Sequence, residues 1–181
     1  SAASSGTITG FGSVFVNGKR FEANDVEVRH DGITERCTVN PTTTCGLKQG
    51  MTVTVNGSFN GSSHTASTIT QEDTVEGPIT SKSQTGASNG TLTILGQTVM
   101  VDETTKFDDS SAPNKLNDLV VGDVVEVSGF VKNGTTGEIG ASFIEKKVGA
   151  SGCAAVCEIK GVVKGHNHAT TTFQIGGLTI V

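Results

Sequence analysis

Apolar and polar residues alternate in short runs along most of the chain. Clear runs lie at residues 52–55, 92–94, 99–101 and 124–127, close to Gly, Asn or Asp. A period of two with many β-branched residues is typical of half-buried β-strands. The pattern therefore predicts an all-β fold of short antiparallel strands.

Asn-Gly pairs mark the expected turns between these strands, because both residues tolerate the positive φ angles of a type I′ hairpin turn. Four of the pairs are also Asn-x-Ser/Thr sequons, but turn chemistry explains them without glycans. The one helical pattern, at residues 112–119, is long enough for a single turn of helix or 3-10 helix. The five pairs begin at Asn17, Asn56, Asn60, Asn89 and Asn133.

One motif, Leu-x-x-Gly-x-x-Val-x-Val-x-Gly, occurs twice in the chain. It begins at Leu47 and again at Leu119, a separation of 72 residues (119 minus 47). This spacing is too long for a solenoid coil and suits a small domain copied in tandem. The sequence therefore predicts a first β module at residues 1–73 and a second at residues 74–148.

A third module begins near Cys157 and is not completed. Residues 157–163 repeat the start of the second module, with Glu158–Ile159 in place of Glu76 and Gly77, and residues 173–181 repeat its first hairpin. No counterpart of the Leu-x-x-Gly motif follows. Because a lone hairpin is marginal in water, we expect residues 149–181 to be a partial module that packs against something else.

The four cysteines form two local pairs, Cys37 with Cys45 and Cys153 with Cys157. An even number of cysteines suggests disulfides, although four cysteines allow three connectivities. Local pairing is favoured here because the short loop within each pair can turn back on itself. Two disulfides would indicate a location outside the cytoplasm.

The alternative for the second pair is a metal site that also uses His166 and His168. The spacing Cys-x3-Cys followed by His-x-His is unusual for zinc, and the two histidines lie in a turn-like sequence. Haem attachment would need a His directly after Cys-x-x-Cys, whereas Glu158 follows Cys157. We therefore expect no metal and no cofactor.

No group of residues in the sequence indicates catalysis. His30 and His64 lie in polar, turn-like segments and are expected to be solvated. No serine lies in a Gly-x-Ser-x-Gly elbow. An acidic loop could in principle bind Ca²⁺, but it lacks the EF-hand spacing and is expected to be solvated. Its carboxylates belong to Asp102, Glu103, Asp108 and Asp109.

Composition narrows the class of protein further. The chain has 24 Gly, no Trp, no Tyr and 17% charged residues, as in β-rich secreted or surface proteins. A net charge of −5 argues against nucleic-acid binding, and no apolar run is long enough to span a bilayer. The small polar residues 1–6 predict the flexible start of an exported, processed chain, so we expect an extracellular or cell-surface protein.

Four segments also carry a family resemblance. They are residues 6–18 (Gly-Thr-Ile-Thr-Gly-Phe-Gly-Ser-Val-Phe-Val-Asn-Gly), 75–79, 95–101 and 122–131. Over residues 6–147 the chain resembles a bacterial secreted and lipoprotein family, domain of unknown function 5666. The resemblance implies tandem small antiparallel barrels of the oligonucleotide/oligosaccharide-binding (OB) type. It transfers no catalytic residue, and the insertion between the first two cysteines and the partial third module depart from its pattern.

The partial module leads to the functional hypothesis. Its strand edges must be covered by the same chain or by a neighbour, and completion by the next copy gives a heterologous contact that builds a filament. Residues 1–6 are a candidate partner strand. We therefore expect a noncatalytic fibre subunit that assembles head-to-tail. The residues expected at the contact are Ile159, Val162, Val163, Phe173, Ile175, Leu178 and Ile180.

The alternative is a secreted module that binds a carbohydrate or another ligand. Small barrels of this type bind oligomers on one face. Such sites generally use exposed aromatic platforms, and this chain has eight Phe with no Tyr or Trp. The composition therefore favours the structural role.

Overall fold

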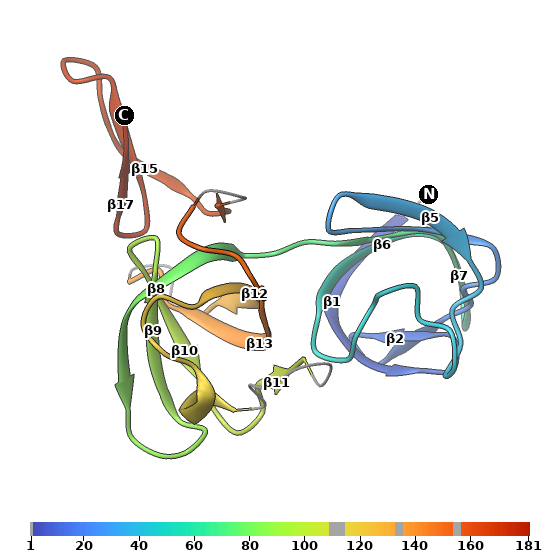
Figure 1. Ribbon diagram of the computed structural model, residues 1–181. Helices are drawn as coiled ribbons and strands as arrows, with labels where there is room; N and C mark the ends of the chain where they lie inside the picture. Colours follow the sequence, from blue (N-terminus) through green and yellow to red (C-terminus); the bar gives the residue numbers. More distant parts are fainter. Residues whose placement is uncertain (1, 109–114, 133–135, 154–156) are drawn as a thin grey trace. The chain divides into compact units, whose positions relative to one another are not determined.

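The computed structural model describes residues 2–108, 115–132, 136–153 and 157–181 (Figure 1). This part of the chain is all-β apart from one 3-10 turn, η1 (Leu116–Asp118). None of its helices is long and apolar enough to cross a membrane. The chain divides into two compact units, Ser1–Glu72 and Asp73–Val181, and each is described by itself.

The first unit, barrel 1, has the strand order β3-β2-β1-β6-β7-β4-β5. An isolated parallel bridge between Glu22 and Thr65 also joins the end of β3 to β7. The order β1-β2-β3-β7-β6 and back to β1 is that of an OB-type barrel. The strands are β1 (Ala2–Phe11), β2 (Val14–Val16), β3 (Lys19–Phe21), β4 (Val26–His30), β5 (Ile33–Cys37), β6 (Thr52–Asn60) and β7 (Ser63–Gln71).

The second unit contains barrel 2, in which five strands close completely. Their order is β10-β9-β8-β12-β13, and β13 returns to β10 through a parallel pairing of Val99 with Ile139. Both units therefore confirm the predicted tandem OB-like barrels. The strands are β8 (Val75–Gln84), β9 (Gly90–Ile94), β10 (Gln97–Val101), β11 (Lys106–Phe107), β12 (Val124–Val131) and β13 (Ile139–Lys146).

The remaining strands belong to the same unit as barrel 2. Strand β14 (Glu158–Ile159) pairs with β8, and β15 (Val163–Asn167), β16 (Thr172–Ile175) and β17 (Leu178–Ile180) form a three-stranded antiparallel sheet, here called the third sheet. The described residues of the expected partial module at 149–181 are thus grouped with barrel 2 in one unit, Asp73–Val181.

The cores follow from the alternation in the sequence. In barrel 2 the inward side chains of the strands are buried together with Leu116 of the 3-10 turn and Leu119, which follows it. The predicted helical turn at 112–119 is confirmed as η1, while residues 112–114 lie outside the described part. Every buried member of this core lies between Val75 and Ile144, so none comes from β14 or the third sheet.

Residues 2–6 of the expected flexible arm at residues 1–6 form a paired strand, contrary to the prediction, and Ser1 lies outside the described residues. Ala2 to Thr7 pair residue by residue with β6, from Ala2 opposite Gly57 to Thr7 opposite Thr52. The segment has small side chains but a complete strand partner, and pairing of the backbone does not depend on side-chain size. Its small residues nevertheless leave the strand largely exposed on its faces.

The Asn-Gly pairs have three different structures. Asn17 and Gly18 have positive φ angles of 53° and 69° and form the predicted hairpin turn. In contrast, Asn56-Gly57 lies within β6 at a bulge, and a Cβ at Gly57 would clash with the Thr65 carbonyl oxygen. Gly is therefore required there for close backbone approach and not for a turn. Gly61 has a positive φ of 56° at the β6–β7 turn, Gly90 starts β9, and Asn133 lies outside the described residues.

Candidate functional site

The third sheet repeats the first three strands of a barrel. Val163 pairs with Ile175, and Ile175 pairs with Leu178. In barrel 2, Ile79 pairs with Ile94, and Ile94 pairs with Gln97. Strand β15 therefore takes the place of the second half of β8. In the same way, β16 takes the place of β9, and β17 that of β10.

This register corrects the alignment made from the sequence. Since Val163 takes the place of Ile79, the residue two positions earlier, Gly161, corresponds to Gly77. The sequence alignment had assigned Ile159 to that position. The difference arises because the sequence alignment matched the identical residues Glu158 and Glu76, whereas the strand register matches Lys160 with Glu76.

The inward face of the third sheet is open. Ile180 in the third sheet takes the position that Phe21 has in barrel 1 and Val99 has in barrel 2. Phe21 and Val99 are fully buried, whereas Ile180 is only half-buried. Within the described residues the third sheet has no counterparts of β12 and β13, which close barrel 2. Of the residues predicted at a subunit contact, Val162 (74%) and Val163 (56%) are strongly exposed. The half-buried ones are Ile159, Phe173, Ile175, Leu178 and Ile180.

Backbone contacts fix the third sheet to barrel 2. Strand β14 adds to β8 with Ile159 opposite Val75, and the Lys160 amide donates to the Thr74 carbonyl over 3.0 Å. At the other end, the Gln97 side-chain amide donates to the Ile175 carbonyl over 2.8 Å. These contacts orient the sheet, whose apolar side chains remain half-buried or, at Val163, exposed.

A pocket of about 430 Å³ lies between the third sheet and barrel 2. Val131 and Ile139 from barrel 2 and Val162 and Ile175 from the C-terminal segment give it apolar walls. Its polar side chains are those of Gln97, Thr136, Lys160 and Lys164. The structure thus brings two of the predicted contact residues, Val162 and Ile175, to one concave site.

The family comparison agrees with this division of the chain. The sequence profile described as Domain of unknown function (DUF5666) matches residues 5–70 and 76–145. The chain belongs to the DUF5666 family. No curated protein and no solved structure matches it. The two DUF5666 segments coincide with barrels 1 and 2, and the third sheet lies outside both.

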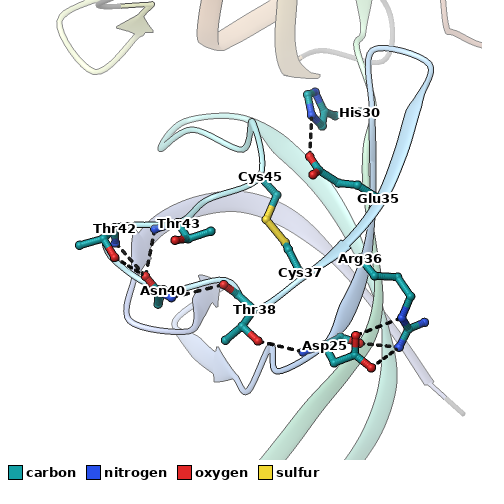
Figure 2. The surroundings of a disulfide bond; sticks show 10 residues. All are labelled: Asp25, His30, Glu35, Arg36, Cys37, Thr38, Asn40, Thr42, Thr43 and Cys45. Atoms are coloured by element: carbon teal, nitrogen blue, oxygen red, sulfur yellow. Dashed lines mark hydrogen bonds and ion pairs between the residues drawn. A yellow bond between two sulfur atoms is a disulfide. The ribbon is translucent and has the colours of Figure 1, made fainter.

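Both predicted disulfides are present. Cys37 is bonded to Cys45 in the polar insertion of the first DUF5666 segment (Figure 2), and Cys153 is bonded to Cys157 just before β14. In the first loop the Asn40 carboxamide oxygen accepts hydrogen bonds from the amides of Thr42 and Thr43, both over 2.9 Å. The sulfur atoms of Cys153 and Cys157 are bonded to each other, so this pair does not supply thiolate ligands for a metal.

The histidines of barrel 1 are half-buried rather than fully solvated, contrary to the prediction. The His64 ring packs against Phe21 and Phe59, with centroid distances of 5.4 and 5.6 Å. The His30 side chain is 14% exposed and lies 3.9 Å from a Glu35 carboxylate oxygen (Figure 2). The sequence could not reveal these contacts, because each joins residues of different strands.

The acidic loop is a hydrogen-bonded turn. Asp102 accepts hydrogen bonds from the Thr104 hydroxyl and amide over 2.6 and 2.9 Å, and these bonds lower the pKa of its carboxyl. Lys132 lies 3.5 Å from the same carboxylate. Asp108 is buried rather than solvated, Glu103 accepts a long hydrogen bond from Asn89, and Asp109 lies outside the described residues.

One buried carboxyl group was missed by the sequence analysis. Glu126 alternates with the core residues Val125 and Val127 on β12, so its side chain leaves the barrel interior. It is nevertheless only 2% exposed. Burial and a hydrogen bond with Asp73 raise the pKa of Glu126 to about 9, although an ion pair with Lys147 opposes the rise. Alternation along the strand places this glutamate outward, but its partners Asp73 and Lys147 are distant in the sequence.

We expect the free energy of unfolding to fall between pH 4.5 and pH 9. The pKa of Glu126 is about 9 in the folded chain, whereas the ordinary pKa of a glutamate, which applies to the unfolded chain, is 4.5. The folded chain therefore binds this proton more tightly than the unfolded chain does. Protonated Glu126 stabilises the folded chain fully at any pH below its pKa in the unfolded chain. This stabilisation is lost as the pH rises to the pKa of Glu126 in the folded chain. One such proton gives a slope of at most about 1.4 kcal/mol per pH unit.

Urea unfolding followed by circular dichroism at pH 5, 7 and 9 measures this slope. Glu126→Gln cannot ionise and keeps the shape of the side chain, so its slope should be flatter. An equal slope in both proteins would show that Glu126 is not the group responsible.

Proposed function

We propose that this DUF5666 protein is a noncatalytic structural subunit of an extracellular fibre. In the fibre, the third sheet of one copy is completed by strands of a second copy. The observation that carries the proposal is the incompletely buried apolar face of the third sheet. Its residues Val163, Phe173, Ile175 and Ile180 lie at positions that are core positions in both barrels. Burying such a face is favourable by about 25 cal/mol per Å² of apolar surface.

Strand pairing defines what the second copy must supply. In barrel 2, β12 pairs antiparallel with β8, and β13 pairs parallel with β10. The first of these pairings involves Val75–Pro78, whose equivalents are residues 159–162 just before β15. The third module therefore needs one strand antiparallel to residues 159–162 and one parallel to β17. Each copy completes the third sheet of one neighbour and has its own third sheet completed by another. Such head-to-tail contacts need not close into a ring, and they then build a filament.

The N-terminal segment is not available as a free donor strand, because Ala2 to Thr7 already pair with β6. The donor strands must instead be strands that offer a second edge or that rearrange on assembly. Two disulfides and the absence of a membrane-spanning helix from the described part are consistent with the proposed extracellular location.

Truncation tests the proposal. A chain ending at Lys147 keeps every residue of the barrel 2 core but loses the third sheet. We expect the whole chain to form fibres visible by negative-stain electron microscopy and the truncated chain to form none. Circular dichroism of the truncated chain serves as the folding control. Fibres that persist after truncation would refute the proposal.

A secreted ligand-binding module is the second candidate, and the pocket beside Gln97 is the observation that favours it. Its volume of about 430 Å³ lies in the range of small-molecule sites. A glycan array is the direct test. Saturable binding that is lost in Ile175→Asp, together with an absence of fibres, would favour this candidate over the fibre.

A further inference from the structure

The contact between barrel 2 and the third sheet has approximate twofold symmetry. Because Val163 corresponds to Ile79, Ile159 corresponds to Val75. These two equivalent residues are also paired with each other where β14 meets β8. A contact in which a residue meets its own equivalent is isologous, as in a C2 dimer.

A second contact obeys the same symmetry. The register places Gly177 of the β16–β17 turn in the position of Gly96 in the β9–β10 turn. A Cβ at Gly96 would lie 2.9 Å from the backbone carbon of Gly177. The two equivalent turns therefore touch at their glycines. Both contacts relate barrel 2 and the third sheet in the same way, so the second unit contains two contacts of isologous type between equivalent residues.

Barrel 1 carries the same surface without that partner. Ile8 pairs with Val16 as Ile79 pairs with Ile94, so Ser4 takes the place of Val75, and Gly18 takes the place of Gly96. Among the described residues, the Ala2–Ser5 part of β1 has a strand partner only in β6. Gly18 has no heavy atom within 4 Å of a Cβ position. In barrel 1, therefore, neither the equivalent strand edge nor the equivalent turn has the contact that it makes in the second unit.

The backbone groups of this edge that point away from β6 have the required direction. The Asn17 side-chain amide, which comes from the turn beyond β2, donates to the Ser5 carbonyl over 2.5 Å. The polar groups of Ser5, and of Ala3 two residues away, therefore point away from β6. In the second unit the equivalent bond runs from the Lys160 amide to the Thr74 carbonyl. The same pairing in barrel 1 would join Ser5 of one chain to Ala3 of another.

We infer that barrel 1 forms a symmetric dimer with barrel 1 of a second copy. The two β1 edges pair antiparallel about Ser4, and the two Gly18 turns meet beside them. No charged side chain lies on this edge, whereas lysines, prolines and bulges are the usual protection of an exposed edge. The dimer contact is separate from the contact proposed for the third sheet and does not depend on it.

A charge-swap experiment tests the dimer in the full chain. All variants carry Ile180→Asp, which is expected to block contacts through the third sheet. Ala3 and Ser5 are exposed, and each faces the other across the proposed dimer axis. The double variants Ala3→Asp/Ser5→Asp and Ala3→Lys/Ser5→Lys place like charges opposite each other, which destabilises strand pairing.

We expect Ile180→Asp alone to be a dimer by sedimentation equilibrium. Each double variant should weaken dimerisation at least tenfold, and an equimolar mixture of the two should restore it as a heterodimer. The matched control, Ser58→Asp/Ser67→Asp, adds the same charge at exposed positions on β6 and β7 and should remain a dimer. Restoration by mixing also shows that the double variants are folded.

The outcomes separate this inference from the fibre proposal. A monomeric Ile180→Asp chain, or double variants that dimerise as well as the control, would overturn the inference even if the natural chain forms fibres. A natural chain that stops at a dimer, with the charge-swap pattern intact, would support the inference and refute the fibre.

Discussion

Replacing Ile180 with Asp should abolish fibre formation, whereas replacing its neighbour Thr179 with Asp should not. Successive residues of a strand point to opposite faces. Ile180 lies on the open apolar face, at the position occupied by Phe21 and Val99 in the barrel cores. Thr179 lies on the opposite, exposed face. Completion of the third sheet would bury the charge of Ile180→Asp but would leave the charge of Thr179→Asp in solvent.

The expected effect is large because a buried, unpaired carboxylate is costly. Its desolvation costs several kcal/mol even after relaxation, which corresponds to a loss of assembly affinity of more than about a hundredfold. Electron microscopy and light scattering of both variants at equal concentration measure the difference. Because the charges are identical and adjacent, equal assembly of the two variants would show that the apolar face is not a contact.

Gly129→Ala should lower the free energy of unfolding of the second unit by about 3 kcal/mol. Gly129 lies at a β-bulge of β12, and a Cβ there would clash with the Gly140 carbonyl oxygen on β13. Since the obstacle is backbone rather than a movable side chain, the two central strands of the barrel must separate locally. Gly57 occupies the equivalent bulge in barrel 1.

Gly86→Ala provides the matched control in the same unit. A Cβ at Gly86 would meet only the Asn89 side chain, at an ordinary distance of 3.6 Å. Its substitution should leave stability unchanged or raise it by up to about 1 kcal/mol. Urea unfolding followed by circular dichroism compares the two. Equal effects of the two substitutions would contradict the role given to the bulge.

The sequence revealed the features that depend on local spacing. Alternation over two residues predicted the strands, and the repeated Leu-x-x-Gly motif predicted two modules of one kind. The pairing of Cys37 with Cys45 and of Cys153 with Cys157 followed from the short loops between them. The partial third module was recognised in the same way, since its hairpin repeats an earlier one.

Features that depend on distant partners could not be predicted. Whether Asn56-Gly57 makes a turn or a bulge is decided by Thr65 on the next strand, and whether residues 2–7 are ordered is decided by β6. The same holds for His64, which is held by Phe21 and Phe59. The symmetric contact of β14 with β8 could be recognised only from the strand register. The sequence alignment had shifted the third module by two residues relative to the second.

The mass of the whole chain in solution is the most direct test of the fibre. We predict that multi-angle light scattering at neutral pH finds species whose mass grows with concentration far beyond that of one or two 18.5 kDa chains. A mass that stays at one or two chains at the highest attainable concentration would contradict the account, because the open face of the third sheet would then be stable in water without a strand partner.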